Sequence, residues 1–290
     1  MDQANKLRDL LNRQQDIPAR KSARVIAVTS GKGGVGKTNF TVNLAIYMMR
    51  KNYRVVIVDA DFGLANIEIL LGVAPRLNMA DVIHNNFSID QAITMSENGV
   101  SFISGGSGLS ALANVGKDQI GQIVEKLSVL DELADIILID TGAGISEAVL
   151  QFVAAAGEAI VVCAPEPTSI TDAYSLIKAS KERTSDLPQF KIVINRAEDE
   201  KEGAEIFRNL QRVAAKFLTV NLELLGTIPY DANLVKSVKR QTPCMMSFPN
   251  TVFSLKMEKI GATLLEINTE KQSSGMKGFM RRLTGLLSRG

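Results

Sequence analysis

Short runs of β-branched and aliphatic residues alternate along the chain with longer segments of mixed apolar and polar positions. Runs with the length and composition of buried strands occupy residues 24–30, 54–58, 100–104, 135–139, 159–163, 191–194 and 224–228. Helix-compatible segments lie at 39–50, 88–93 (where Ser88 can act as cap), 116–130, 169–183 (where Thr168 can act as cap) and 251–267. Strands that alternate with helices form a parallel sheet covered on both faces, so the pattern predicts a single doubly wound, mostly parallel α/β domain.

The N-terminal end carries an amphipathic segment outside this alternation. Ala4, Leu7 and Leu11 fall on one face of a short predicted helix, which a polar tether containing Pro18 joins to the domain. The segment is either a clasp that packs on its own domain or a ligand for a partner, and the pattern leaves both interpretations open. We divide the chain into residues 1–22 (helix and tether), 23–270 (the α/β domain) and 271–290 (linker and terminal helix).

The C-terminal segment predicts a second amphipathic helix. At 100° per residue its apolar side chains share an arc of roughly 120°, and its lysine and arginine side chains lie outside this arc. A basic amphipathic helix beyond a polar Ser/Gly linker predicts reversible binding to an anionic membrane surface, and a packed final helix is the alternative. The predicted membrane residues are Met276, Phe279, Met280, Leu283, Leu286 and Leu287.

The first apolar run leads directly into a phosphate-binding motif. The residues from Gly31 to Thr38 fit G-x-x-x-x-G-K-[ST] between a predicted strand and a predicted helix. Backbone N–H groups of such a loop surround phosphate oxygens, Lys37 reaches the β- and γ-phosphates, and Thr38 supplies a hydroxyl to Mg²⁺. The sequence therefore predicts a site for ATP or ADP with Mg²⁺, formed by Gly31, Lys32, Gly33, Gly34, Val35, Gly36, Lys37, Thr38 and Asn39.

The loop contains a second lysine, Lys32, that the phosphate cradle itself does not need. The motif K-G-G-x-G-K-T with this lysine resembles the deviant Walker A motif of the MinD/ParA ATPases. In that family the extra lysine reaches the nucleotide of the partner subunit. The resemblance therefore implies a homodimer that forms with ATP and separates after hydrolysis. It also implies that Lys32 and Lys37 take part in catalysis by a slow, Mg²⁺-dependent ATPase.

Aspartates follow two of the predicted strands, at the edge where ligands of open α/β sheets bind. Asp59 and Asp61 end one strand, and Asp140 ends another in a Walker B pattern. We expect Asp59 and Asp140 to assist Mg²⁺, and a carboxylate at this edge can orient the attacking water. By resemblance to the family, Asp61 is the switch I aspartate that positions this water. Residues 63–66 continue switch I, and residues 141–144 resemble switch II.

Two later strand ends carry candidates for binding the base. The Asn195 amide can pair with an adenine edge and the Arg196 plane can stack on the base, although a simple turn is the alternative for Asn195. The family resemblance favours the base contact and extends it to Pro229 and Asp231 after the next strand. The sequence has no N-K-x-D guanine signature, which favours ATP over GTP.

Charge and composition exclude several other classes of protein. A net charge of +2 argues against a protein that coats nucleic acid. The sequence has one histidine, His84, and Cys163 lies far from Cys244, so neither a metal cluster nor a disulfide framework is indicated. An iron–sulfur carrier on this fold would need paired cysteines at the dimer face. No apolar run reaches the roughly 20 residues of a membrane span, so we expect a cytoplasmic protein with reversible peripheral membrane contact.

The first residues narrow the resemblance. Asp2, Gln3, Ala4, Leu7 and Arg8 are similar to the N-terminal motif of the FlhG family, the flagellar branch of the MinD-type ATPases. In that family the segment stimulates the GTPase FlhF, and flagellar C-ring proteins are further partners. The resemblance implies a membrane-associated switch that controls flagellar number and placement. A cell-division MinD and a ParA-type DNA-partition ATPase are alternatives. The N-terminal extension counts against the first, and the terminal helix against the second.

Overall fold

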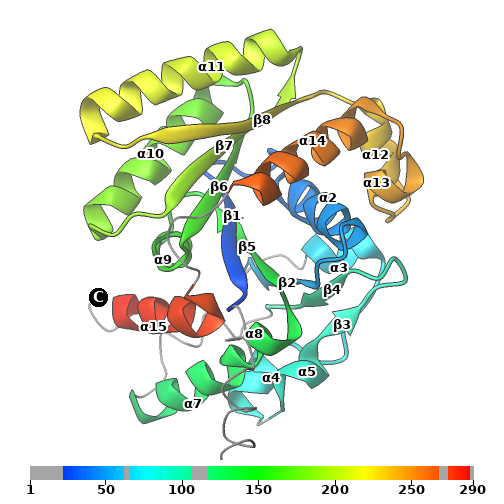
Figure 1. Cartoon of the computed structure of the whole chain (residues 1–290), viewed down its shortest axis with the longest axis vertical. Coiled ribbons are helices and arrows are strands. Elements are labelled where there is room, and N and C mark those ends of the chain that lie inside the picture. The colour runs from blue at the N-terminus through cyan, green and yellow to red at the C-terminus, as the bar shows by residue number, and fades with distance from the viewer. Residues whose placement is uncertain (1–21, 62–65, 86, 106–116, 268–273, 288–290) are drawn as a thin grey trace, which may run out of the picture.

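An eight-stranded sheet runs through the centre of the computed structural model, which describes residues 22–61, 66–85, 87–105, 117–267 and 274–287 (Figure 1). The strand order is β3-β4-β2-β5-β1-β6-β7-β8, and every neighbouring pair is parallel except β3 with β4. The predicted doubly wound, mostly parallel fold is confirmed. The strands are β1 (Arg24–Ser30), β2 (Val55–Ala60), β3 (Thr94–Met95), β4 (Ser101–Ile103), β5 (Ile136–Ala143), β6 (Glu158–Cys163), β7 (Gln189–Ala197) and β8 (Leu222–Pro229).

The central strands are buried on both faces, which explains their continuous apolar sequence. Along β1, Val25 and Ala27 belong to the core on one side of the sheet, whereas Ile26 and Val28 belong to the core on the other side. A strand placed in this way needs apolar residues at every position. Polar residues lie toward the ends of the strands, and the predicted site lies at the carboxyl ends.

One face of the sheet is covered by α2 (Lys37–Arg50) and α14 (Val252–Glu266). The prediction that the segment at 251–267 covers the sheet is confirmed. The two helices approach closely because Gly261 has no side chain, and a Cβ at that position would lie 2.1 Å from the Tyr47 ring. The shorter helices on this side are α3 (Asn66–Leu71), α12 (Ala232–Lys239) and α13 (Cys244–Ser247).

The opposite face is covered by a larger set of helices (Figure 1). Ser88 is the N-cap of the short helix α5, and Gln91 completes a capping box with it, as the sequence predicts. The helices on this side are α4 (Met79–His84), α5 (Ile89–Ala92), α7 (Lys117–Ser128), α8 (Leu130–Leu133), α9 (Glu147–Ala155), α10 (Pro167–Arg183), α11 (Glu200–Val213) with the π-helical turn η2 (Ala214–Leu218), and α15 (Gly275–Leu287).

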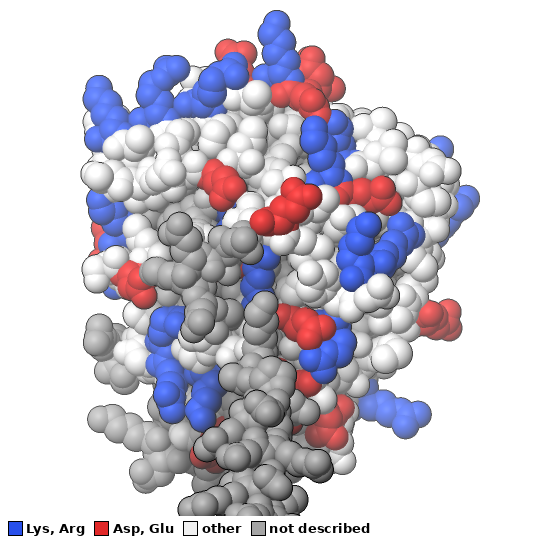
Figure 2. Space-filling view, in the orientation of Figure 1, with Lys and Arg blue, Asp and Glu red and all other residues white. Residues whose placement is uncertain are grey.

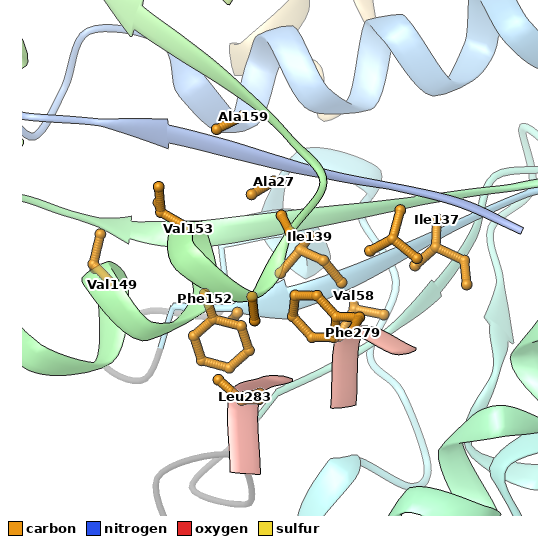
Figure 3. Close-up of a cluster of buried hydrophobic side chains, with 14 of the residues drawn as sticks. Ala27, Val58, Ile137, Ile139, Val149, Phe152, Val153, Ala159, Phe279 and Leu283 are labelled. Atoms are coloured by element: carbon orange, nitrogen blue, oxygen red, sulfur yellow. The ribbon is translucent and has the colours of Figure 1, made fainter. Parts of the chain in front are cut away.

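The C-terminal helix α15 packs into the core of the domain (Figure 3). Met276, Phe279, Met280 and Leu283 are each 2% exposed or less. The Phe279 ring stacks on Phe152 of α9, with 6.0 Å between the ring centroids. The packed-helix alternative therefore describes this structure, because the apolar face predicted to enter a membrane is covered by α7, α9 and the sheet.

Polar contacts fix the start of α15. The carboxylate of Asp131 in α8 accepts the backbone N–H groups of Met276 at 2.7 Å and Lys277 at 3.2 Å. It also accepts the N–H of Ala23, just before β1, at 3.3 Å. Gly275 has a φ of 66°, and a Cβ on it would lie 2.5 Å from Asp131 Oδ1, so only glycine fits here. One carboxylate thus joins the first and last elements of the described chain.

The second half of α15 is held by Arg282. Its Nε donates to the carbonyl of Ala155 at the end of α9, at 2.7 Å. Leu286 is half-buried, and the side chain of Leu287 lies outside the described part of the chain. Taken over the residues that the structure describes, no helix is long and apolar enough to cross a membrane.

Charged side chains of both signs are spread over the surface (Figure 2). On the face shown, lysine and arginine side chains gather over α11, at the top of the view. Arg208, Arg212 and Lys216 are exposed on this helix and the turn that follows it. The small net charge of +2 therefore coexists with a local concentration of positive charge on this helix.

An ionic cluster is buried at the amino edge of the sheet, the edge opposite the predicted site. Glu158 accepts from Arg24 Nε at 2.7 Å and from Lys191 Nζ at 2.6 Å, and the Lys191 side chain is fully buried. Burial alone would raise the pKa of Glu158, but the hydrogen bond and charge of Arg24, together with Lys191, hold this pKa below its usual range. The cluster links β1, β6 and β7.

Replacing Glu158 with Gln is expected to lower the free energy of unfolding by about 3–5 kcal/mol, because Lys191 would remain buried without a counter-charge. The control is Glu147→Gln, which removes an exposed pair with Arg183 and should cost less than about 1 kcal/mol. Urea denaturation of both variants measures the difference. Equal losses of unfolding free energy in the two variants would contradict the conclusion that Glu158 neutralises a buried charge.

Candidate functional site

The predicted phosphate-binding loop lies between β1 and α2, at the carboxyl edge of the sheet. Gly34 and Gly36 have φ values of 78° and 97°, a conformation that other residues rarely adopt. A Cβ on Gly36 would also lie 2.5 Å from the Asn195 amide nitrogen. The loop therefore has the turn and the close backbone approach of an anion cradle at a helix N-terminus.

Lys37 is buried at the start of α2 and points to the end of β5. Its Nζ lies 3.0 Å from Asp140 Oδ1, and the same oxygen accepts a hydrogen bond from Thr41 Oγ1 at 2.9 Å. Thr38 and Asn39 are half-buried in the first turn of the helix. The structure thus brings together the predicted P-loop and Walker B residues, and adds Thr41, which the motif does not include.

Two carboxylates beside the loop have oxygens without a hydrogen-bond partner. Asp59 and Asp140 are opposite each other in the β2–β5 ladder. Asp59 Oδ1 accepts the N–H of Asp61 at 3.0 Å, whereas the Oδ2 atoms of Asp59 and Asp140 are buried and unpaired. Burial raises the pKa of Asp59 to about 7. The hydrogen bond from the Asp61 N–H lowers this pKa, and the nearby charge of Asp140 raises it further. Buried unpaired oxygens of this kind are costly, and a cation or its water ligands would satisfy them.

These residues fit Mg²⁺ bound together with a nucleotide. Mg²⁺ commonly takes one or two carboxylates with phosphate oxygens and keeps several waters. Thr38 would supply a hydroxyl, and the free oxygens of Asp59 and Asp140 would hold water ligands. Within the described ranges, no group of three or more His, Cys, Asp or Glu residues could hold a metal by itself, so the ion would depend on the phosphates.

Asp61 lies between the two predicted switches. Its Oδ2 is 3.4 Å from the Asn66 amide nitrogen in switch I, and a Cβ on Gly142 in switch II would lie 3.7 Å from its Oδ1. A carboxylate placed between the switches can orient a water, which is the role predicted for Asp61. Residues 62–65 of switch I lie outside the described residues.

Lys32 is held at the rim of the site by the start of α10. Its Nζ donates to Glu166 Oε2 at 2.6 Å and to Thr168 Oγ1 at 3.0 Å. The Lys32 and Glu166 side chains are 40% and 54% exposed, so this pair costs little to open. The prediction that Thr168 caps the helix is wrong, because α10 begins at Pro167 and the Thr168 hydroxyl accepts from Lys32. Glu166 is a site residue that the motif search missed, although it follows β6 at this edge.

Asn195 supports the phosphate loop directly. It is buried at the end of β7, and its Nδ2 donates to the Val35 carbonyl at 2.7 Å. This bond holds the P-loop against the neighbouring strand. The amide nitrogen is therefore occupied in this structure, and the predicted contact of Asn195 with the base stays a prediction for its oxygen.

The other predicted base contacts lie at the ends of β7 and β8. Arg196 is exposed with a φ of 64° at an irregularity of β7, and Pro229 is half-buried opposite the next residue, Ala197. Asp231 has a structural task, because its carboxylate accepts the N–H groups of Asn233 at 2.8 Å and Phe253 at 3.0 Å. It caps α12 and ties that helix to α14. Arg196 and Pro229 are thus better placed than Asp231 to meet a base.

Comparisons with known proteins agree with this geometry. The ParA family model described as NUBPL iron-transfer P-loop NTPase matches residues 21–265. Antiactivator FleN of Pseudomonas aeruginosa is 38% identical over 237 residues, covering 82% of this chain and 84% of FleN. Flagellum site-determining protein YlxH of Helicobacter pylori is 32% identical over 291 residues, covering 97% of this chain and 98% of YlxH. The chain belongs to the ParA/MinD family of P-loop ATPases.

Solved structures share the fold of this ATPase. MinD of Aquifex aeolicus is 25% identical, with a TM-score of 0.67 over 85% of this chain and 98% of that protein. MinD of Pyrococcus horikoshii, solved in complex with Mg-ADP, is 23% identical, with a TM-score of 0.68 over 84% of this chain and 96% of that one. Together with FleN and YlxH, these matches confirm the resemblance predicted from the sequence, including its flagellar branch.

The two cysteines of the ATPase are buried and separate. Cys163 lies in β6 and Cys244 in α13, both at 0% exposure. Burial raises the pKa of the Cys163 thiol to about 12, which keeps it protonated at neutral pH. These thiols do not form the paired set that an iron–sulfur cluster needs.

Replacing Asp59 with Asn is expected to stabilise the nucleotide-free ATPase at pH 8 by about 2–4 kcal/mol, and by much less at pH 5. The pKa of Asp59 is raised to about 7 in the folded chain, so the wild type loses stability as the pH rises from about 4 to 7 and the buried carboxyl must ionise. Denaturation in EDTA at both pH values measures the effect. A gain that does not depend on pH would show that the Asp59 charge is not its cause.

Proposed function

We propose that the ATPase is a nucleotide-controlled switch that dimerises with ATP and controls flagellar number and placement. The observation that carries this proposal is Lys32. Lys32 lies at the nucleotide edge of the sheet, outside the cradle that Lys37 occupies. Its ammonium group is held by the exposed carboxylate of Glu166 and the hydroxyl of Thr168. The name of one relative, flagellum site-determining protein YlxH, favours a flagellar role over cell division or DNA partition.

Each residue of the site would have its own role in ATP hydrolysis by such a dimer. Lys37 would leave Asp140 for the phosphates, and Asp140, with Oδ1 still bound by Thr41, would hold water ligands of the metal through its unpaired Oδ2. Mg²⁺, when bound, would neutralise charge on the phosphates. Asp61 would orient the attacking water, and Lys32 would leave Glu166 to stabilise the charge on the partner's nucleotide.

Membrane association in this proposal requires release of α15. The docked helix buries Met276, Phe279, Met280 and Leu283, each worth about 1.5–3 kcal/mol, and a lipid surface would bury the same side chains. The free energies of the docked and the lipid-bound helix therefore differ little, and a coupling of about 1–3 kcal/mol from nucleotide binding can shift the equilibrium between them. An ATP dimer would present two helices and bind more tightly through effective concentration.

The partner proposals concern residues outside the described part of the chain. Asp2, Gln3, Ala4, Leu7 and Arg8 would contact the GTPase FlhF and stimulate it. Flagellar C-ring proteins would be further partners. The agreement of this segment with the FlhG motif and the name of the relative YlxH, flagellum site-determining protein, support these proposals.

Replacing Asp61 with Ala is expected to lower ATP turnover by about 10²-fold or more while the ATP dimer still forms, because the variant loses the group that orients water but keeps the lysines. Phosphate release and size-exclusion mass with ATP measure the two properties. Asp90→Ala, at an exposed aspartate of α5, is the control and should change neither. Normal hydrolysis in the Asp61 variant would remove its proposed role.

Replacing Asp131 with Ala is expected to increase binding to anionic vesicles in the ADP state by about 3- to 30-fold, because α15 loses the carboxylate that caps its start. Vesicle co-sedimentation with ATP and with ADP is the measurement. Asp199→Ala removes the cap of α11 in the same way, away from α15, and should leave binding unchanged. ATP dimers that ignore vesicles would rule out the membrane part of the proposal.

A further inference from the structure

A pocket of about 470 Å³ lies at the amino edge of the sheet, the edge opposite the P-loop. It forms where the end of α2, the start of β2, α8 and the β3–β4 pair meet. Its apolar lining includes Met49, Tyr53, Ile93 and Leu133. Tyr53 and Leu133 are 39% and 36% exposed, and Met95 of the adjoining β3 is 69% exposed. Partly exposed apolar side chains around a hollow offer a surface on which an apolar segment can pack.

The chain enters the domain beside this pocket. Arg24 pairs with Ile136 in the sheet, and Ile136 pairs with Val55, which lines the pocket. Two strand spacings of about 4.8 Å place the start of β1 about 10 Å from Val55. The N–H of Ala23 is bound by Asp131 of α8, the helix whose last residue lines the pocket. Figure 1 shows the start of β1 close to α8.

The chain before Ala23 has the composition and length to fill the pocket. Residues 1–21 contain Leu7, Leu10, Leu11 and Ile17. Leu11 is twelve positions before Ala23, so an extended connection reaches up to about 40 Å, which exceeds the distance required. We propose that residues 1–21 bind in cis to the pocket lined by Met49, Tyr53, Ile93 and Leu133, with Leu7 and Leu11 as the apolar contacts.

The short connection makes even a weak contact effective. A segment tethered this close has an effective concentration in the millimolar range, so an affinity near 0.1 mM would keep the pocket about nine-tenths occupied. Such a contact yields to a partner that binds the same leucines more tightly. The pocket therefore competes with the partner for the segment. In this way the segment is both of the things that the sequence pattern allowed, a clasp on its own domain and a ligand for a partner.

Labelling of a cysteine in the pocket tests this proposal. Both natural cysteines are fully buried, so a substituted Tyr53→Cys reports alone. We expect maleimide to label Tyr53→Cys about tenfold more slowly in the otherwise unchanged chain than in the Leu7→Glu/Leu11→Glu background. Val213→Cys on α11 is the matched control, because Val213 is also 39% exposed, and its rate should not depend on the leucines.

A second pair of substitutions separates apolar contact from charge. Asn5→Glu/Asn12→Glu changes the charge by the same amount on the polar side of the segment, and should keep the slow labelling. Equal rates with and without the leucines overturn the proposal. Slow labelling that disappears on dilution also overturns it, since the occupant would then be a second copy of the chain.

Amide hydrogen exchange checks the result without changing Tyr53. Exchange in residues 49–56 should become faster when Leu7→Glu/Leu11→Glu is introduced, and unchanged exchange there overturns the proposal. Neither measurement uses ATP, vesicles or a GTPase. A negative result for the cis contact would therefore not contradict the proposed switch function, and a negative result for the switch would not contradict this contact.

Discussion

The buried ion pair between Lys37 and Asp140 is the interaction on which the nucleotide site depends. It joins the start of α2 to the end of β5, and Thr41 adds a second hydrogen bond to the same carboxylate oxygen. A buried charge without a partner is strongly destabilising, so loss of either side chain alone would destabilise the site. Phosphate would give Lys37 a different anion and leave Asp140 for the metal waters. The same contact thus maintains the loop and makes it responsive to nucleotide.

Much of this site could be predicted from the sequence because its spacing is local. The glycines, Lys37 and Thr38 lie within eight consecutive residues at the junction of the loop and α2, and the order of strands brings Asp59 and Asp140 to the same edge. Glu166 was not predicted because its contact with Lys32 spans 134 positions and leaves no local pattern. Thr168 does not cap α10 because the helix begins one residue earlier at Pro167, and proline is favoured at the first helical position. The strand β3 was missed because its two residues carry no periodicity.

The C-terminal helix shows a physical limit of sequence patterns. An amphipathic pattern indicates that one side of a helix is apolar, but lipid and protein cores are both apolar environments. The contacts that distinguish them, Phe152 under Phe279 and Asp131 at the helix start, come from segments more than 100 positions away. Four other helices, α9, α11, α12 and α13, were not predicted from the sequence. Three of them have a local start signal, because Ser146, Asp199 and Asp231 are side-chain N-caps of α9, α11 and α12, whereas Pro243 before α13 is not.

The place of α15 in the core has a consequence for the lifetime of the protein. When the helix leaves the domain, side chains beneath it, such as Phe152 under Phe279, lose their cover and the core becomes smaller (Figure 3). A domain with less buried apolar surface opens more often, and open chains are the substrates of proteases. Molecules on a membrane would therefore be degraded faster than molecules with the helix docked. The helix release that is proposed to recruit the ATPase to a membrane would then also limit how long each recruited molecule lasts.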